Sequence, residues 1–163
     1  MYIQAPYDTP GMVNKGRVKG IPNMSFADTV GAKEAQSTEL IAVTQHERVT
    51  LAASFMCEHN VGSLVVIADD DDDTMVGIVT ERDIIRWIGN ASPETYFQPV
   101  RDIMTRDVAS CKPGTRVIDV LAEMKYRRIR HMPVVHKGKP VGMLSLRDLL
   151  EDCVNSMSSL RHV

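Results

Sequence analysis

The apolar residues of this chain fall into short strand-like runs and longer helix-like segments, and this order occurs twice. Each strand-like run holds consecutive aliphatic or β-branched residues and is bounded by turn-forming residues. The runs that predict strands are residues 40–43, 64–67, 75–79, 108–111, 131–135 and 141–144.

Four further segments carry apolar residues at the spacing of a helix. The predicted helices are a segment that ends at His59-Asn60 and residues 81–88, 116–127 and 146–153. The positions expected to face inward are Val49, Ala52, Ala53 and Met56 in the first copy and Val117, Val120, Leu121 and Met124 in the second. The element order is therefore β-α-β-β-α, followed by the same order again.

The two copies also match in sequence. Residues 48–66 match 116–134 at a shift of 68 residues, and residues 76–85 match 141–150 at a shift of 65. The three extra residues of the first copy fall in the acidic stretch 69–73, which we expect to be a longer turn. A duplicated supersecondary unit predicts two similar halves packed on each other with a cleft between them.

Each small sheet has predicted helices on one side only, so its other face is apolar and needs a partner. This predicts a mixed α/β (α+β) fold of two β-α-β-β-α repeats packed sheet to sheet with pseudo-twofold symmetry. The expected divisions are an irregular arm at 1–36, a first repeat at 37–91, a linker at 92–104, a second repeat at 105–155 and a tail at 156–163. The arm is either a flexible tail or a segment that crosses onto a partner subunit.

Charge is nearly balanced overall but unevenly spread. The formal net charge is −2, yet residues 1–100 hold 7 Lys/Arg against 14 Asp/Glu, and residues 101–163 hold 12 against 7. The basic second half suits an anionic ligand, or it is a solvated basic face.

Three cysteines without paired spacing (Cys57, Cys111 and Cys153) argue against a disulfide scaffold and fit a reducing compartment. No apolar run reaches the roughly 18 residues of a membrane span. The N-terminus lacks the features of a signal peptide. We therefore expect a cytoplasmic protein without membrane partners. The absence of a basic stripe with interleaved aromatic residues also argues against nucleic-acid binding.

The clearest candidate chemistry lies where a strand meets a helix in each copy. Thr80 precedes Asp83 by three residues, as Ser145 precedes Asp148. One interpretation is a helix cap in which Asp replaces the usual Glu or Gln. The other is a nucleotide site, because a helix N-terminus suits a phosphate and a carboxylate can accept hydrogen bonds from a ribose diol. Spacing alone does not separate the two interpretations, and both can hold together.

These residues carry a family resemblance. The segments HNVGSLVVI…VGIVTERDI and RRIRHMPVV…VGMLSLRDLL resemble the two halves of a tandem CBS-domain pair, also called a Bateman module, and DIMTRDV resembles the approach to its second half. The resemblance covers roughly residues 36–155. It implies a regulatory module, with no catalytic residues and no metal, that binds AMP, ADP, ATP or S-adenosylmethionine.

The resemblance also implies which residues contact the ligand. The Asp of each signature would hold the ribose, and the Thr or Ser would reach a phosphate. The first site would use Thr80 and Asp83 with the base near Val61, Gly62, Ser63 and Leu64. The second site would use Ser145 and Asp148 with the base near Ile129, Arg130, His131, Met132 and Pro133, closed by Thr105 and Val108.

The second site is expected to bind the phosphorylated ligand more tightly. Arg130-His131 stands where the first copy has Gly62-Ser63, and Arg gives charge-assisted hydrogen bonds that Gly cannot. Arg127 and Arg128 have a simpler interpretation as a solvated helix end. His131 is either a ligand contact or a satisfied, partly buried ring.

The leading hypothesis is thus an adenosine-nucleotide sensor that stands alone, forms a homodimer and signals to an unknown protein partner. The apolar residues Ile84, Ile85, Trp87, Ile88, Leu149 and Leu150 are the expected dimer surface. The alternative is a structural or oligomerisation module with unoccupied pockets. An enzyme is disfavoured, because the sequence shows no nucleophile–base pair and no metal-ligand set. The acidic run 69–73 lacks the spaced ligands of a calcium loop and is expected to be a solvated turn.

Overall fold

The computed structural model describes residues 40–69, 73–90 and 97–151. The predicted arm 1–36, the tail 156–163 and most of the acidic turn therefore lie outside the described residues. The first unit consists of β1 (Ala42–Thr44), α1 (Val49–His59), β2 (Ser63–Ile67), β3 (Met75–Thr80) and α2 (Glu81–Gly89). The second consists of α3 (Val117–Arg127), β4 (His131–His136), β5 (Lys139–Ser145) and a helix over residues 146–151, after a short 3-10 turn, η2 (Val100–Asp102).

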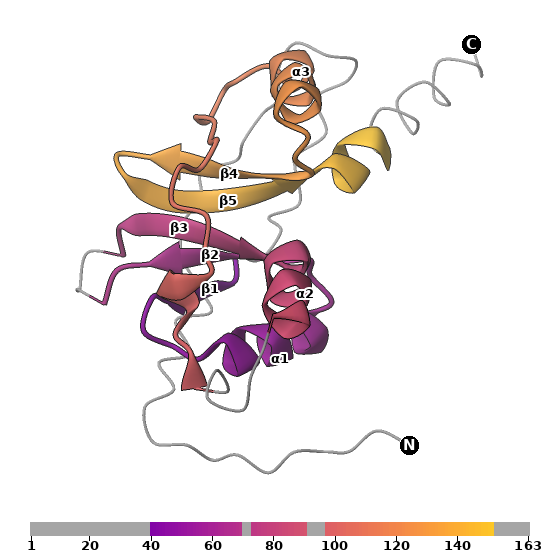
Figure 1. Cartoon of the computed structure of the whole chain (residues 1–163). Helices are drawn as coiled ribbons and strands as arrows, with labels where there is room; N and C mark the ends of the chain where they lie inside the picture. Colours follow the sequence, from indigo (N-terminus) through magenta and orange to yellow (C-terminus); the bar gives the residue numbers. More distant parts are fainter. Residues whose placement is uncertain (1–39, 70–72, 91–96, 152–163) are drawn as a thin grey trace, which may run out of the picture.

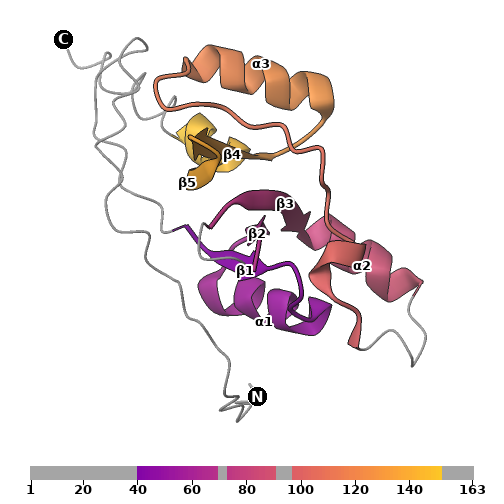
Figure 2. The same cartoon turned by 90° about the vertical axis from the view of Figure 1, so that its left-hand side faces the viewer.

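The sheets stack face to face, as the one-sided pattern predicts. β2 pairs in parallel with β1 and antiparallel with β3, and β4 pairs antiparallel with β5. In Figures 1 and 2 the β4–β5 hairpin lies over the β1–β2–β3 sheet, with α3 on the outer side of one sheet and α1 on the outer side of the other. The predicted mixed α/β architecture of two stacked repeats is confirmed.

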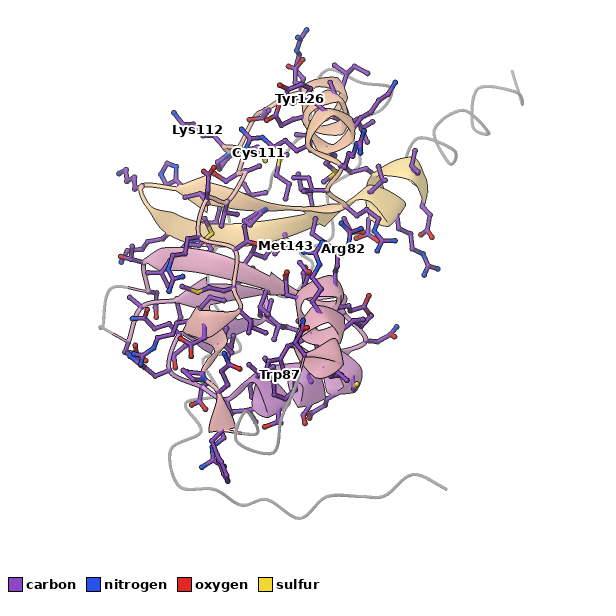
Figure 3. All side chains as sticks on the ribbon, in the orientation of Figure 1. Arg82, Trp87, Cys111, Lys112, Tyr126 and Met143 are labelled. Carbon is purple, nitrogen blue, oxygen red and sulfur yellow. The ribbon has the colours of Figure 1, made fainter. Side chains whose placement is uncertain are left out.

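Burial follows from this stacking. Every residue of β2 is buried, because one face meets α1 and the other meets the second unit. Val65 and Ile67 pack with Met143 of β5, which lies between the two sheets in Figure 3. The inter-unit contact is therefore part of the apolar core.

The helices bury most of the faces that their spacing predicts. In α1 the buried residues are Val49, Ala52 and Met56, and in α3 they are Val120 and Met124, with Ala53, Val117 and Leu121 packed at the margin. Both helices end in a left-handed residue, Asn60 (φ 52°) and Arg128 (φ 57°).

The predicted strand at 108–111 is wrong in extent. Cys111 makes one parallel bridge to Val134, through Cys111 N–H to Pro133 O (3.0 Å) and Val135 N–H to Cys111 O (2.8 Å). In the first unit Val65 N–H donates to Ile41 O (3.3 Å), and Pro133 occupies the matching position to Val65. Since proline has no N–H, that bond cannot form in the second unit, and the strand shrinks to a bridge.

Residues 97–109, which connect the two units and extend past the predicted linker 92–104, are called the linker from here on. They dock onto the first unit through an isolated antiparallel bridge between Thr105 and Ile78. Ile78 and Thr105 exchange two backbone hydrogen bonds of 3.0 and 2.9 Å. This requires a close approach at Gly77, where a Cβ atom would lie 2.7 Å from Met104 Sδ and 2.9 Å from Thr105 O. The second half of the chain therefore starts from a point fixed on β3.

Two residues of the expected dimer surface lie inside the units instead. Ile84 and Leu149 are buried in the cores of their own units, since each packs its helix onto its own sheet. Trp87 packs at the margin of the first core and donates from Nε1 to Gln98 Oε1 (2.9 Å). Ile85, Ile88 and Leu150 remain exposed.

Candidate functional site

A cavity of about 420 Å³ opens where the two units meet. Its wall comes from β3 and the start of α2 in the first unit, from the linker, and from the end of α3 with the start of β4 in the second. Eight of the residues predicted as ligand contacts line it: Gly62, Thr80, Asp83, Thr105, Val108, Ile129, Arg130 and His131.

The strand-to-helix junction of the first unit places Thr80 and Asp83 on this wall. Thr80 N–H donates to Asp83 Oδ2 (2.9 Å), and Thr80 Oγ1 donates to the same oxygen (2.6 Å). The predicted cap is therefore present. Asp83 Oδ1 accepts no hydrogen bond from any residue that the structure describes, so the carboxylate keeps one oxygen for a ligand.

The second unit repeats this junction in a looser form. Asp148 N–H donates to Ser145 Oγ (3.2 Å), and both residues lie outside the lining of the 420 Å³ cavity. Backbone bonds are equivalent in the two copies: Glu81 N–H donates to Gly62 O (3.0 Å), and Leu146 N–H donates to Arg130 O (2.8 Å). These bonds tie each helix start to the loop that precedes β2 or β4.

The two units touch at Gly62. A Cβ atom on Gly62 would lie 3.2 Å from Glu81 Oε2 and 3.2 Å from His131 Cε1. Burial lowers the pKa of His131, and the charge of Arg130 lowers it further, against the opposite effect of Glu81 and Asp148. The neutral imidazole is thus favoured at the centre of the contact.

Positive charge dominates the cavity wall. Five arginines line it, Arg82, Arg86, Arg127, Arg128 and Arg130, against three acids, Glu81, Asp83 and Asp107. Arg127 forms an ion pair with Glu123 on the same helix, which agrees with its interpretation as a solvated helix end. The other positive charges lie within reach of an anion in the cavity.

The remaining predicted contacts lie elsewhere. Leu64, Met132 and Pro133 are buried within their sheets, and Ser63 is almost fully buried at the start of β2. The sequence expectation grouped Ile129–Pro133 with Ser145 and Asp148. The cavity instead joins Ile129, Arg130 and His131 to Thr80 and Asp83, because the packed units face each other across the pseudo-twofold axis. Contact of any of these residues with a ligand stays a prediction.

Several lining residues were missed by the sequence analysis. Glu81 and Arg82 stand inside the Thr-Glu-Arg-Asp junction. Glu81 is replaced by Leu146 in the second copy, so the repeat did not mark it, whereas Arg82 is repeated as Arg147 and that repetition is a signal that could have found it. Arg86 lies one helical turn after Arg82, and Asp107 lies in the linker beside Thr105. Their proximity depends on the docking of the linker, which the pattern alone does not encode.

Other kinds of site receive no support from the described ranges. Within residues 40–69, 73–90 and 97–151, no three His, Cys, Asp or Glu side chains gather as a metal site would need. Over the same part of the chain, every helix is too short or too polar to cross a lipid bilayer.

Comparison with known proteins identifies the family. The family model of the CBS domain matches residues 32–90 and 100–155. An uncharacterized 17.7 kDa protein of Acidianus ambivalens is 40% identical over 114 residues, which cover 69% of this chain and 66% of that protein. An uncharacterized conserved protein from Pyrococcus horikoshii has a crystal structure with 41% identity and a TM-score of 0.63, covering 70% of this chain and 84% of that one.

A more distant structure contains a ligand. The crystal structure of CBSX2 in complex with AMP has a TM-score of 0.63 at 24% identity, covering 71% of this chain and 89% of that one. At this identity the likeness concerns the fold. With its duplicated junctions, its stacked sheets and both family matches, the chain belongs to the CBS-domain family and contains a tandem pair of these domains.

Proposed function

We propose that the cavity between the two units binds an adenosine nucleotide of the AMP, ADP or ATP type, and that binding regulates a partner or an oligomer. One observation carries this proposal. A single cavity joins a carboxylate with an unused oxygen, at Asp83, to a group of arginines from the opposite unit. A nucleotide needs this combination, because its sugar donates hydrogen bonds and its phosphates carry negative charge.

The sugar end of the ligand is assigned to the α2 junction. Asp83 Oδ2 is occupied by the cap, and Oδ1 is available to accept from a ribose hydroxyl. Thr80 Oγ1 donates to Asp83 Oδ2 and, in the capping box, accepts from the backbone N–H of Asp83, which leaves one lone pair of the hydroxyl for a ligand. The cap and the nucleotide interpretations of the junction are therefore compatible in this site.

The phosphate end is assigned to Arg130 and its neighbours. Guanidinium groups give charge-assisted, often bidentate bonds to phosphate. The base is assigned to the apolar part of the wall at Ile78, Val108 and Ile129. An AMP complex of the structural relative CBSX2 supports this ligand class. S-adenosylmethionine, whose charge is positive, fits the arginine-rich wall less well.

Regulation follows from the position of the cavity. A ligand there would contact the first unit, the linker and the second unit at once, so it would favour one arrangement of the three parts. A partner that prefers the same arrangement would then bind more tightly in the presence of the nucleotide. No catalytic step is included in the proposal.

The rival function is assembly without a ligand. It is favoured by the exposed apolar residues of α2, where Ile85 is 67% and Ile88 is 60% exposed. Self-association through this face is also part of the nucleotide proposal, so a dimer alone does not separate the two functions. Ligand binding does.

The test is calorimetric titration with AMP, ADP, ATP, S-adenosylmethionine and NAD, combined with the Asp83→Ala variant. A ligand at 100 times its Kd stabilises the folded state by about 2.7 kcal/mol. Loss of a charged hydrogen bond to the ribose should cost about 1.5–3 kcal/mol, which is roughly 10–100-fold in affinity.

Asp119→Ala is the matched control. Asp119 occupies the third position of α3, as Asp83 does in α2, but it pairs with Arg116 (2.7 Å) and lies outside the cavity. We expect the control to leave affinity unchanged. If Asp83→Ala lowers stability but binds the nucleotide as the native protein does, the carboxylate is only a cap. If none of the five compounds binds, the assembly function is the better account.

A further inference from the structure

A second groove, of about 410 Å³, runs directly beside the cavity. It shares Arg82, Arg128, Ile129 and Arg130 with the cavity and continues along α3 to Lys125. Its charged residues are all basic, and its remaining wall is apolar. The cavity and the groove together form a continuous path from the Asp83 carboxylate to a region whose charged residues are all basic and which ends at Lys125.

The four cations of the groove are not neutralised by neighbouring acids. Among the residues that the structure describes, Arg82, Lys125, Arg128 and Arg130 form no ion pair. Like charges held close together repel each other, and an anion bound between them removes that repulsion. The groove therefore has a charge pattern that a bound anion would complete.

The fold itself does not require these charges. The corresponding helix in the first unit ends with the same left-handed geometry, φ 52° and ψ 45° at Asn60 against φ 57° and ψ 38° at Arg128. At the positions that match Lys125 and Arg130 the first unit has Cys57 and Gly62. Asn tolerates the left-handed region better than Arg does, so Arg128 gains nothing locally from its position.

The helix dipole explains only part of the cluster. Lys125 and Arg128 lie at the C-terminal end of α3, where a cation is favourable. Arg82 is the second residue of α2, at the positive end of that helix, where a cation is unfavourable. In Figure 3 its side chain extends from α2 toward the second unit. Arg82 thus adds positive charge to the groove against the preference of its own helix.

We propose that this groove receives the outer phosphates of a polyphosphate ligand, so that the protein distinguishes a nucleoside triphosphate from a monophosphate. The inference rests on the proposed nucleotide site and extends it. The sugar would lie at Asp83 and the first phosphate at Arg130, and further phosphates would continue between Arg82 and Arg128 toward Lys125. The number of phosphates then sets how much of the groove is filled.

The test compares AMP, ATP and inorganic triphosphate on the native protein and on Lys125→Ala. Lys125 lines the groove and not the cavity, so its loss should leave AMP affinity unchanged. We expect ATP and triphosphate to bind about tenfold more weakly to the variant, as for the loss of one solvent-exposed charged contact. The slope of ATP affinity against salt concentration should also become smaller.

Lys112→Ala is the control, since it removes the same charge from an exposed position of the second half that lines neither hollow. It should change neither affinity. If AMP and ATP bind the native protein with equal affinity, the groove does not receive the outer phosphates, but the nucleotide function remains. The same conclusion follows if Lys125→Ala lowers the affinities for AMP and ATP equally. Binding of triphosphate, weakened by Lys125→Ala, without any binding of AMP or ATP would support the groove and refute the adenosine function.

Discussion

Adding one methyl group at Gly77 should separate the linker from the first unit. Gly77 lies in β3 opposite Val66, beside the point where the linker pairs with Ile78. In Gly77→Ala the new Cβ would lie 2.7 Å from Met104 Sδ and 2.9 Å from Thr105 O. Both distances are shorter than ordinary van der Waals contact.

The two contacts differ in how they can relax. The Met104 side chain can move by rotating, although it is buried and must repack. The Thr105 carbonyl cannot move alone, because it accepts from Ile78 N–H at 3.0 Å. Overpacking of this kind costs about 1–3 kcal/mol, and each lost backbone bond costs about 1 kcal/mol. Against this, replacing Gly by Ala in a strand gains about 0.5–1 kcal/mol. We expect a net destabilisation of about 1–3 kcal/mol.

The repeat provides a matched control at Gly142, which corresponds to Gly77. A Cβ atom there would meet only Val134, at 3.8 Å, which is ordinary contact. Gly142→Ala should therefore be neutral or slightly stabilising. The same substitution at equivalent positions of the two copies is therefore expected to destabilise the protein at Gly77 only.

Urea denaturation of both variants gives the free energies of unfolding, and the m-values show whether the extent of unfolding is unchanged. Nucleotide titration adds a second measurement, since Thr105 lines the cavity and should move in Gly77→Ala only. A Gly77→Ala protein as stable as the native one, with a similar result for Gly142→Ala, would show that the linker contact does not constrain β3.

Two further predictions concern the centre of the molecule and the outer face of α2. Burial lowers the pKa of His131 in the folded state, so the unfolded chain takes up the proton first as the pH falls. The free energy of unfolding should therefore decrease as the pH falls below 6.5, the pKa of this histidine in the unfolded chain. The free energy of unfolding should be measured at about pH 7.5 and about pH 5.5. Between these values it should decrease less for His131→Asn than for the native protein or for His136→Asn, which replaces an exposed histidine as the control. An equal decrease in all three proteins would contradict this role of His131. On α2, replacing Ile85 or Ile88 by Lys should convert a dimer to monomers with little change in stability, since both side chains are largely exposed. Sedimentation would measure this, and a native protein that is already monomeric at high concentration would refute the dimer.

Much of the fold follows from local patterns along the chain. The helical spacing marked the faces of α1 and α3 that are buried, and the alternation of strands and turns located β2 through β5 within one or two residues. The repeat predicted stacked sheets because each unit has an apolar face that cannot be satisfied alone. The short second-unit strand was also foreseeable, since Pro133 removes the donor that Val65 supplies in the first copy.

The composition of the candidate site depended on the tertiary structure. The sequence marked Thr80, Asp83, Arg130 and His131 as chemically capable, but the repeat suggested that each unit forms its own site. Packing across the pseudo-twofold axis places the start of α2 against the start of β4, so one cavity takes Asp83 from the first unit and three of its five arginines from the second. Periodicity is a property of neighbours along the chain, and it carries no information about which residues of two different units face each other.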